Sequence, residues 1–476
     1  MEIIARLVLV VMLWTPVPVL AAEDTPPAEP QVTVDTYEKL KTFSEILSLV
    51  EGNYVEDVNV DDLIDGAIRG MVKALDPHTS YLPPKSFKEM MVDTSGKFGG
   101  LGIEISMRKG MLTVVSPIEG TPADEAGILA GDKIIKIEDE STLDMSLSDA
   151  VARLRGNVGT PINITIFRDS LEQPKEVRIV RDIIKVRSVQ SKIYRGDIGY
   201  VKIRSFSKTT SEDLDNALAD LEKKNITKLV LDVRNNPGGL LNQAVEVTDR
   251  FLDRESLIVY TKGRNEEQNM RFTTHDKVKR ATYPMIVLVN GGSASASEIV
   301  AGALQDLGRA VILGTNSFGK GSVQTIIPLS DGSALRLTTA RYYTPSGRVI
   351  QENGIKPDIV VEMPLASEAD DEGEEAEGEK EPAEKQRLRK FLRERDLKKH
   401  LKGKESIELP DGEDKAGGAV DEKARALEAS LEEDLRKDLQ LQQAVALLSG
   451  WDVMNKTIKG SSSKVPAAGD QVTMSR

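Results

Sequence analysis

The segment that most constrains the fold runs from residue 285 to residue 324. It begins with an apolar run, Met285–Val289, which has the length and composition of one buried parallel strand. Small and polar residues then break the strand and lead into a helical pattern over Glu298–Leu307. A second apolar run, Ala310–Leu313, precedes a Gly-rich loop that carries Lys320. This order predicts a buried sheet with a Ser-rich turn and a Lys-containing loop beside it.

The turn and the loop contain the residue types that a nucleophilic site requires. A serine in a strand-to-helix turn exposes its hydroxyl at the sheet edge, where the first amides of the helix also point. The hydroxyl needs a base, and none of the histidines, His78, His275 and His400, lies in a triad context. A lysine can act as the base if desolvation keeps it neutral, and the loop around Lys320 contains no acidic residue. From composition alone, a helix cap and a solvated lysine are the simpler interpretation, and His78 is expected to be structural.

The same segment resembles the carboxy-terminal processing, or tail-specific, serine proteases. The matching motifs are Ser-Ala-Ser-Ala-Ser-Glu at 293–298, Gln-Asp at 305–306, and Phe-Gly-Lys-Gly at 318–321 followed by Gln324. In that family the middle serine is the nucleophile and a lysine 25 positions later is the base, which implies Ser295 and Lys320 because 320 − 295 = 25. The resemblance further implies that Gln324 fixes the lysine by a hydrogen bond and that Asp306 has a supporting role.

A second motif supplies the implied oxyanion donors. An apolar strand is predicted at Leu229–Val233, and residues 232–239 match the Asp-x-Arg-x-Asn-Pro-Gly-Gly run of the same family. The resemblance implies one donor amide in this loop, with Gly239 favoured over Gly238, and another on Ala296. Two such donors can supply about 3–4 kcal/mol each to the transition state. The alternative is that the glycine pair only forms a left-handed turn.

Residues 96–182 form a strand-rich module with its own pattern. Strands are predicted at 111–115, 133–137 and 162–167, and a helix at 147–154 with Ser146 as its cap. This order, with its Gly-Leu-Gly-Ile loop, resembles a PDZ domain; a β-rich linker domain is the alternative. A PDZ domain binds an extended C-terminus along a strand edge and holds its carboxylate on loop amides. The resemblance therefore implies substrate binding by Gly100, Leu101, Gly102 and Ile103.

The remaining patterns place helices at both ends of the chain. Helical spacing occurs at 37–54, 61–75 and 432–448, a basic helix is predicted at 386–402, and residues 261–284 are expected to form a surface excursion without chemistry. We expect a multidomain α+β protein with an α/β Ser/Lys protease core, split by an inserted β-rich PDZ domain, and with N- and C-terminal helical regions. The predicted parts are a signal peptide at 1–22, an N-terminal helical region at 23–95, the PDZ domain at 96–182, the protease core at 183–364, an acidic disordered linker at 365–385, and a C-terminal helical region and tail at 386–476.

Composition narrows the location and the partners. The formal net charge is −13, which does not point to nucleic acid, and the absence of cysteine excludes disulfides and thiolate metal sites. No metal or other cofactor is expected. Residues 1–22 have the apolar core and small-residue end of a cleavable signal, which indicates export to a bacterial periplasm. An uncleaved membrane anchor is the alternative.

These observations predict a serine endopeptidase of the carboxy-terminal processing type. It would recognise unstructured C-termini through the PDZ domain and cleave periplasmic proteins. By analogy with the family, substrates include cell-wall hydrolases, an adaptor lipoprotein can deliver them, and the terminal helices pair subunits into a homo-oligomer. The alternative is a non-catalytic PDZ-type binding or scaffold protein for C-termini.

Overall fold

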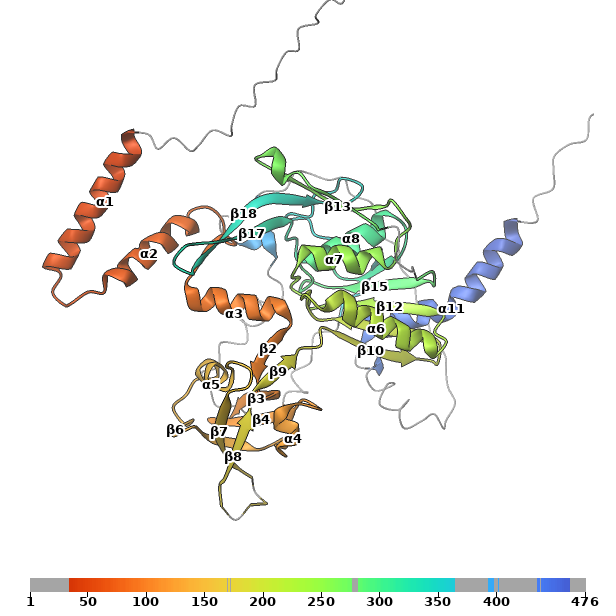
Figure 1. Cartoon of the computed structure of the whole chain (residues 1–476). Coiled ribbons are helices and arrows are strands. Elements are labelled where there is room, and N and C mark those ends of the chain that lie inside the picture. Colours follow the sequence, from red (N-terminus) through yellow and green to blue (C-terminus); the bar gives the residue numbers. More distant parts are fainter. Residues whose placement is uncertain are drawn as a thin grey trace, which may run out of the picture. The chain divides into compact units, whose positions relative to one another are not determined.

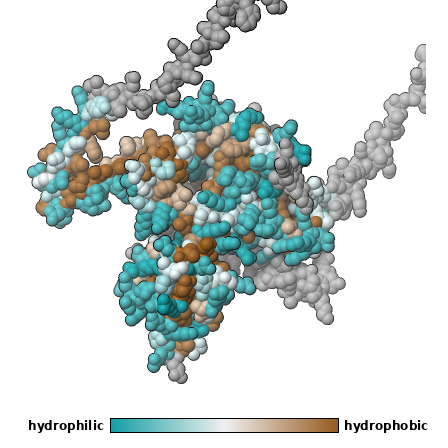
Figure 2. Space-filling view, in the orientation of Figure 1, coloured by the Kyte–Doolittle hydropathy of each residue, from teal (hydrophilic) through white to brown (hydrophobic). Residues whose placement is uncertain are grey.

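The structure is a computed structural model that describes residues 34–168, 170–171, 173–275, 281–363, 393–397, 401, 435–436 and 438–462. The chain divides into two compact units, Met1–Ile68 and Arg69–Arg476. The first unit contains α1 (Val34–Asn53) and the start of α2 (Val60–Lys73), as the helical spacing predicts. Figure 2 shows hydrophobic surface along these helices, to which the exposed side chains of Leu40, Phe43 and Ile46 contribute.

The apolar runs of the sequence form a six-stranded sheet in the second unit. Its order is β10-β11-β12-β15-β16-β19, and β11, β12, β15, β16 and β19 are parallel while β10 is antiparallel to β11. The strands are β10 (Val189–Tyr194), β11 (Ile198–Ile203), β12 (Lys228–Asp232), β15 (Met285–Val289), β16 (Val311–Gly314) and β19 (Ile359–Val360). Polar turns at the carboxyl ends of β12 and β15 therefore meet at one edge of the sheet.

Helices cover both faces of this sheet (Figure 1). Apolar residues of α6 (Thr210–Lys223), α7 (Leu241–Asp249) and α8 (Ala296–Asp306) share one core cluster with alternate strand residues such as Leu231 and Val287. The opposite strand residues pack against Leu441 and Val445 of α11 (Leu439–Ser462). Burial on both faces explains why the strands consist of continuous apolar runs.

A second sheet includes part of a segment that was wrongly predicted to be a surface excursion. Its order is β1-β18-β13-β14, with β17 paired to β18. The strands are β1 (Ser80–Leu82), β13 (Leu257–Gly263), β14 (Arg271–Thr273), β17 (Ser322–Pro328) and β18 (Ala334–Tyr343). The 3-10 turn η1 (Glu266–Gln268) lies between β13 and β14. Residues 261–284 are thus not simply a surface excursion, because part of this segment pairs in the sheet and Thr261 is buried. The charged residues of this segment concealed β14, a three-residue strand of which Phe272 alone is partly buried.

The strand-rich module has a core of its own. It contains β2 (Lys97–Gly100), β3 (Ile103–Arg108), β4 (Met111–Pro117), α4 (Pro122–Glu125), β5 (Lys133–Ile137), β6 (Glu140–Ser141), α5 (Leu147–Leu154), β7 (Pro161–Phe167), β8 (Lys175–Val180) and β9 (Asp182–Lys185), and follows α3 (Pro84–Ser95). The main sheet has the order β3-β4-β5-β7-β8, while β2 and β9 pair separately. The Ser146 hydroxyl accepts a hydrogen bond from the Asp149 amide and caps α5, as predicted.

The described parts of the C-terminal region differ from the basic helix predicted at 386–402. Residues 394–396 form a single 3-10 turn, η3 (Glu394–Asp396), between extended residues Arg393 and Leu397, so the continuous helix was wrong over 393–397. The rest of that helix, the signal peptide and the acidic linker lie outside the described residues. Within the described residues, no helix has the length and apolar character to cross a membrane.

Candidate active site

Ser295 lies in the turn between β15 and α8, directly before the helix begins, and has a strained backbone. Its φ and ψ are 53° and −110°, a positive φ that is uncommon outside glycine. Such strain persists only where surrounding contacts enforce it, and it is concentrated at functional sites.

The structure distinguishes the three serines of the turn. Ser293 Oγ donates to the carbonyl of Val233 at 2.8 Å, and Ser297 Oγ donates to the carbonyl of Asn236 at 2.9 Å. Both serines are fully buried, whereas Ser295 is only partly buried. Among the described residues, no backbone carbonyl holds the Ser295 hydroxyl, so it is the one hydroxyl of the turn that can approach a substrate.

Glu298 connects the serine turn to the lysine loop, a role that the sequence analysis missed. One carboxylate oxygen accepts from the Ser317 hydroxyl at 2.6 Å and the Gly319 amide at 2.7 Å. The other accepts from the Ser295 amide at 2.8 Å and the Lys320 amide at 2.9 Å. Burial raises the pKa of this carboxyl to about 7, while the four donors act in the opposite direction. The capping-box spacing from Ser295 to Glu298 was the available signal.

Lys320 is partly buried, and burial lowers the pKa of its amine. The carboxylates of Glu394, Asp76 and Glu298 act to raise it again, while Arg336 acts to lower it. The loop around Lys320 contains no acidic residue, as the sequence shows, but these three carboxylates come from other parts of the chain. In the described part of the chain, no hydrogen bond joins Lys320 Nζ to Ser295 Oγ; Glu298 links their backbones instead.

Gln324 does not form the implied hydrogen bond to Lys320. Its Nε2 donates to the hydroxyls of Thr338 at 2.8 Å and Ser322 at 3.3 Å, and its buried Oε1 has no partner among the described residues. An unpaired buried acceptor is available to an ammonium donor. Asp306 instead accepts from the amide and hydroxyl of Ser346 and holds that turn in place.

The predicted oxyanion amides are positioned beside the serine. The Gly238 amide already donates to Asn236 Oδ1 at 2.9 Å, whereas neither Gly239 nor Ala296 has a described acceptor for its amide. A Cβ on Gly238 would lie 2.9 Å from Ser295 Cβ and 3.0 Å from the Ala296 nitrogen, so the loop and the serine turn are in direct contact. Of the two glycines, Gly239 therefore has the amide that is free to donate.

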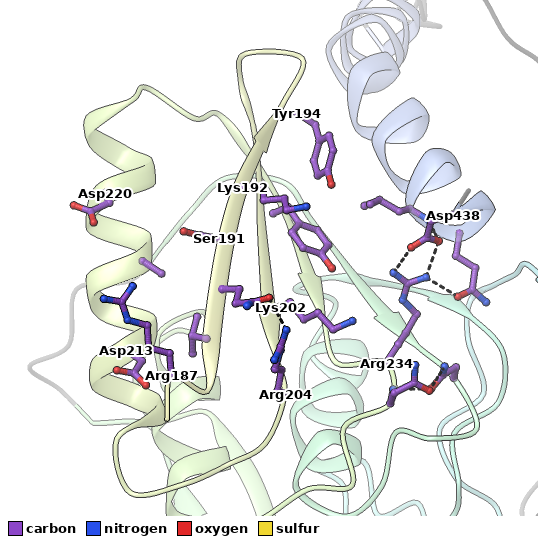
Figure 3. Close-up of a pocket in the computed structure, with 18 of the residues that line it drawn as sticks. Arg187, Ser191, Lys192, Tyr194, Lys202, Arg204, Asp213, Asp220, Arg234 and Asp438 are labelled. Atoms are coloured by element: carbon purple, nitrogen blue, oxygen red, sulfur yellow. Dashed lines mark hydrogen bonds and ion pairs between the residues drawn. The ribbon is translucent and has the colours of Figure 1, made fainter. Parts of the chain in front are cut away.

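Buried ion pairs hold the loop that carries these glycines (Figure 3). The Arg234 guanidinium binds both oxygens of Asp438, at 2.7 and 2.6 Å, and both oxygens of Asp232, at 3.0 and 2.7 Å. Burial acts to lower the pKa of Arg234, but the hydrogen bonds to Asp438 and Asp232 outweigh it and raise the pKa. Arg234 also borders a groove of about 1130 Å³ that none of the predicted site residues lines.

A smaller pocket lies at the glycine loop itself. Its volume is about 420 Å³, and it is lined by Met90 and Thr94 of α3, by Phe206, and by Gly238 and Gly239. The pocket is thus bordered by the glycine loop, but Ser295 and Lys320 do not line it.

The predicted peptide site on the strand-rich module has free amides too. Gly102 has φ +79°, and a Cβ there would lie 2.3 Å from Thr121, so this tight turn requires glycine. The carbonyls of Leu101 and Gly102 accept from Ala123 and Ile118, while their own amides have no described acceptor. Ile103 begins β3, which is an edge strand of its sheet. Edge strand and free amides are the elements that a PDZ domain uses.

Comparison with known proteins identifies the modules. Residues 197–361 match the model of peptidase family S41, residues 113–168 match the PDZ domain, and residues 6–86 match the N-terminal domain of the activating protease CtpB. A carboxy-terminal-processing protease of Bartonella bacilliformis is 46% identical over 420 residues, which cover 87% of this chain and 89% of the relative. The carboxy-terminal processing protease CtpA of Bacillus subtilis is 36% identical over 327 residues, covering 68% of this chain and 70% of the relative.

Among solved structures, a photosystem II D1 C-terminal processing protease matches with a TM-score of 0.40 and 30% identity, covering 67% of this chain and 92% of that one. Together, the long match to the Bartonella relative and the two domain models confirm the fold class and the enzyme class predicted from the sequence. The chain belongs to the carboxy-terminal processing proteases, serine peptidases of family S41 that contain a PDZ domain.

Proposed function

We propose that this peptidase cleaves its substrates with a Ser295–Lys320 dyad. The observation that supports it best is the difference between Ser295 and its neighbours. The hydroxyls of Ser293 and Ser297 donate hydrogen bonds to backbone carbonyls. Ser295 has a strained backbone and is partly exposed. The lowered pKa of Lys320 is consistent with a neutral amine at the pH of turnover.

The reaction would proceed in two halves. Neutral Lys320 accepts the proton of Ser295, and the serine oxygen attacks the scissile carbonyl, whose oxygen is stabilised by the amides of Gly239 and Ala296. Lys320 then protonates the leaving amine. In the second half, Lys320 takes a proton from water as the water attacks the acyl-enzyme, and then returns that proton to the Ser295 oxygen as it leaves. Rotation of Lys320 toward the unpaired Oε1 of Gln324 would restore the implied hydrogen bond.

For the substrate, we propose proteins with unstructured C-termini that bind residues 100–103 of the PDZ domain. The free amides of Leu101 and Gly102 fit a terminal carboxylate. The signal-like residues 1–22 support a periplasmic location, and the family analogy suggests cell-wall hydrolases as substrates, an adaptor lipoprotein and a homo-oligomer.

The test compares two serine variants in an assay for fragments of an unfolded protein. Ser295→Ala is expected to reduce turnover to background because the nucleophile is gone. Ser297→Ala loses one buried hydrogen bond, about 1 kcal/mol of stability, and is expected to keep measurable turnover. Cleavage by Ser295→Ala at the parent rate would disprove the dyad, and a parent that yields no fragments would favour a binding or scaffold protein.

A further inference from the structure

A short segment beyond the matched peptidase region packs against the Lys320 loop. It runs from Arg393 to Leu397 and includes the turn η3. The Glu394 amide donates to the carbonyl of Phe318 at 3.1 Å, and Glu394 is fully buried. The segment therefore contacts the loop two residues before the lysine.

The Glu394 side chain connects this segment to two others. Its carboxylate oxygens lie 2.8 and 2.7 Å from Nε2 of His78, in the turn that precedes β1. One of them also accepts from Nε2 of Gln351 at 2.9 Å, and Oε1 of Gln351 accepts from the Gly321 amide at 3.0 Å. The lysine loop is thus fastened on both sides of Lys320, at Phe318 directly and at Gly321 through Gln351.

A buried carboxylate such as that of Glu394 is energetically costly unless it is paired and hydrogen-bonded. Its direct side-chain partners are an imidazole and an amide, neither of which carries a permanent positive charge. The charges that act on Lys320 are Glu394 first, then Arg336 on β18, Asp76 and Glu298. The Asp76 carboxylate already accepts a hydrogen bond from Thr79, and the Glu298 carboxylate accepts hydrogen bonds from four donors. Both carboxylates therefore already bind other groups.

We propose that Glu394 is a positioning residue of the peptidase: it holds the Lys320 loop in place and sets a carboxylate charge beside the lysine amine. The inference rests on the proposed role of Lys320 as the base. It assigns part of the active site to a segment outside the matched peptidase region, reached through His78 at the other end of the chain. The opposing effects of burial and of the Glu394 charge would then set the pH at which the amine becomes neutral.

The pH dependence of turnover tests the charge. In Glu394→Gln, the side chain keeps its shape but loses the charge that favours the ammonium, so the rise of kcat/KM with pH is expected to begin at lower pH than in the parent. The matched control is Asp396→Asn, which removes a charge from the same segment at an exposed position whose side chain accepts from the Arg393 amide. Its profile is expected to coincide with that of the parent.

Amide hydrogen exchange tests the fastening without any need for activity. In the Ser295→Ala background, Glu394→Ala is expected to speed exchange at residues 318–321 about tenfold or more, because the Phe318 and Gly321 contacts lose their support. In the active chain, the same substitution is expected to lower kcat by up to about 100-fold, since small misplacement of a catalytic group has effects of that size. Circular dichroism of each variant checks that it is folded.

The outcomes separate the two proposals. If Ser295→Ala is inactive but Glu394→Gln leaves the pH profile unchanged, the role of Glu394 is disproved while the dyad stands. If amide exchange becomes faster but the pH profile of turnover does not move, the charge effect is likewise refuted, and Glu394 makes a structural contact only. A parent whose activity does not rise with pH contradicts the lysine base, and the inference for Glu394 fails with it.

Discussion

Glu298 shows how one side chain can organise a site without touching the substrate. Its carboxylate accepts from the amides of both Ser295 and Lys320, and from Ser317 and Gly319 as well. The strained φ of Ser295 is therefore held by the same group that holds the lysine loop. The proposed nucleophile and the proposed base are thus connected through one carboxylate although 320 − 295 = 25 positions separate them.

We predict that Glu298→Gln is poorly active and less stable. Each carboxylate oxygen accepts two donors, so the amide nitrogen of glutamine would face two of them and leave buried groups unpaired, at about 1–3 kcal/mol each. Turnover is expected to fall by up to about 100-fold through misplacement of both reacting groups. Denaturant unfolding and kcat measure the two effects. The control Glu212→Gln, an exposed residue of α6, should behave as the parent; a Glu298→Gln variant that does so too would contradict the argument.

The Lys320 amine predicts the direction of the pH profile. Burial lowers its pKa from the ordinary 10.5, and only the neutral amine can take a proton from serine. Activity should therefore rise as pH increases through a value below 10.5 and then level off. Initial rates on one unfolded substrate, corrected for enzyme stability at each pH, check this expectation. A rate that is flat from acid to alkaline pH would be inconsistent with a lysine base.

Among the elements, the loop after β12 depends on α11 for its position. Arg234 donates to Asp232 at the end of β12 and to Asp438 just before α11, so it connects the start of the loop to the helix. The Arg234 and Asp438 side chains are 9% and 25% exposed, so this pair is largely shielded from water. The helix thereby stabilises the loop whose Gly239 amide is the proposed oxyanion donor.

We predict that Asp438→Ala lowers the free energy of unfolding by about 1.5–3 kcal/mol, because the buried Arg234 loses two charge-assisted hydrogen bonds and keeps Asp232 as its carboxylate partner. Turnover should fall as well if α11 positions the loop. The control is Asp220→Ala, which breaks the exposed Lys223–Asp220 pair of 3.0 Å and should cost less than about 1 kcal/mol. Urea unfolding of both variants provides the comparison. Equal losses in the free energy of unfolding would show that the Arg234–Asp438 pair contributes no more to stability than an exposed ion pair.

For the whole molecule, the proposed recognition site and the proposed catalytic residues lie in separate modules. The PDZ module has its own core cluster, distinct from the clusters on either face of the peptidase sheet. This separation allows the C-terminus of a substrate to bind at one place while an internal peptide bond is cleaved at another. Affinity and turnover should then respond to different parts of the same substrate.

We predict that a substrate with an amidated C-terminus is cleaved less efficiently than the same chain with a free carboxylate. The amides of Leu101 and Gly102 would lose a charged acceptor, and hydrogen bonds to charged groups contribute about 1.5–3 kcal/mol. The ratio kcat/KM should fall about tenfold or more. Because the enzyme is unchanged, no folding defect can interfere, and equal cleavage of both substrates would exclude carboxylate recognition.

Much of the fold could be predicted from the local sequence. The runs at 229–233 and 285–289 are apolar throughout because both faces of the sheet are covered, and the helix at 147–154 begins at a serine cap that the structure retains. The strands at 257–263 and 271–273 were not predicted: the first is a mainly apolar run in which Lys262 is the one charged residue, and the second has three residues and begins with the charged Arg271. The helix predicted at 386–402 failed over 393–397, where Glu394 is buried against the lysine loop instead of continuing a helix.

The sequence by itself determined the modules, the buried strands and the serine and lysine motifs, because these depend on spacing and polarity along a short stretch of chain. Only the tertiary structure decided which serine keeps its hydroxyl free, since the acceptors of Ser293 and Ser297 lie on another strand's loop. It also decided the electrostatic environment of Lys320: the loop contains no acid, yet folding brings Glu394, Asp76 and Glu298 close to it. Electrostatic interactions act through space, so charges far away in the sequence control an amine whose own neighbours are neutral.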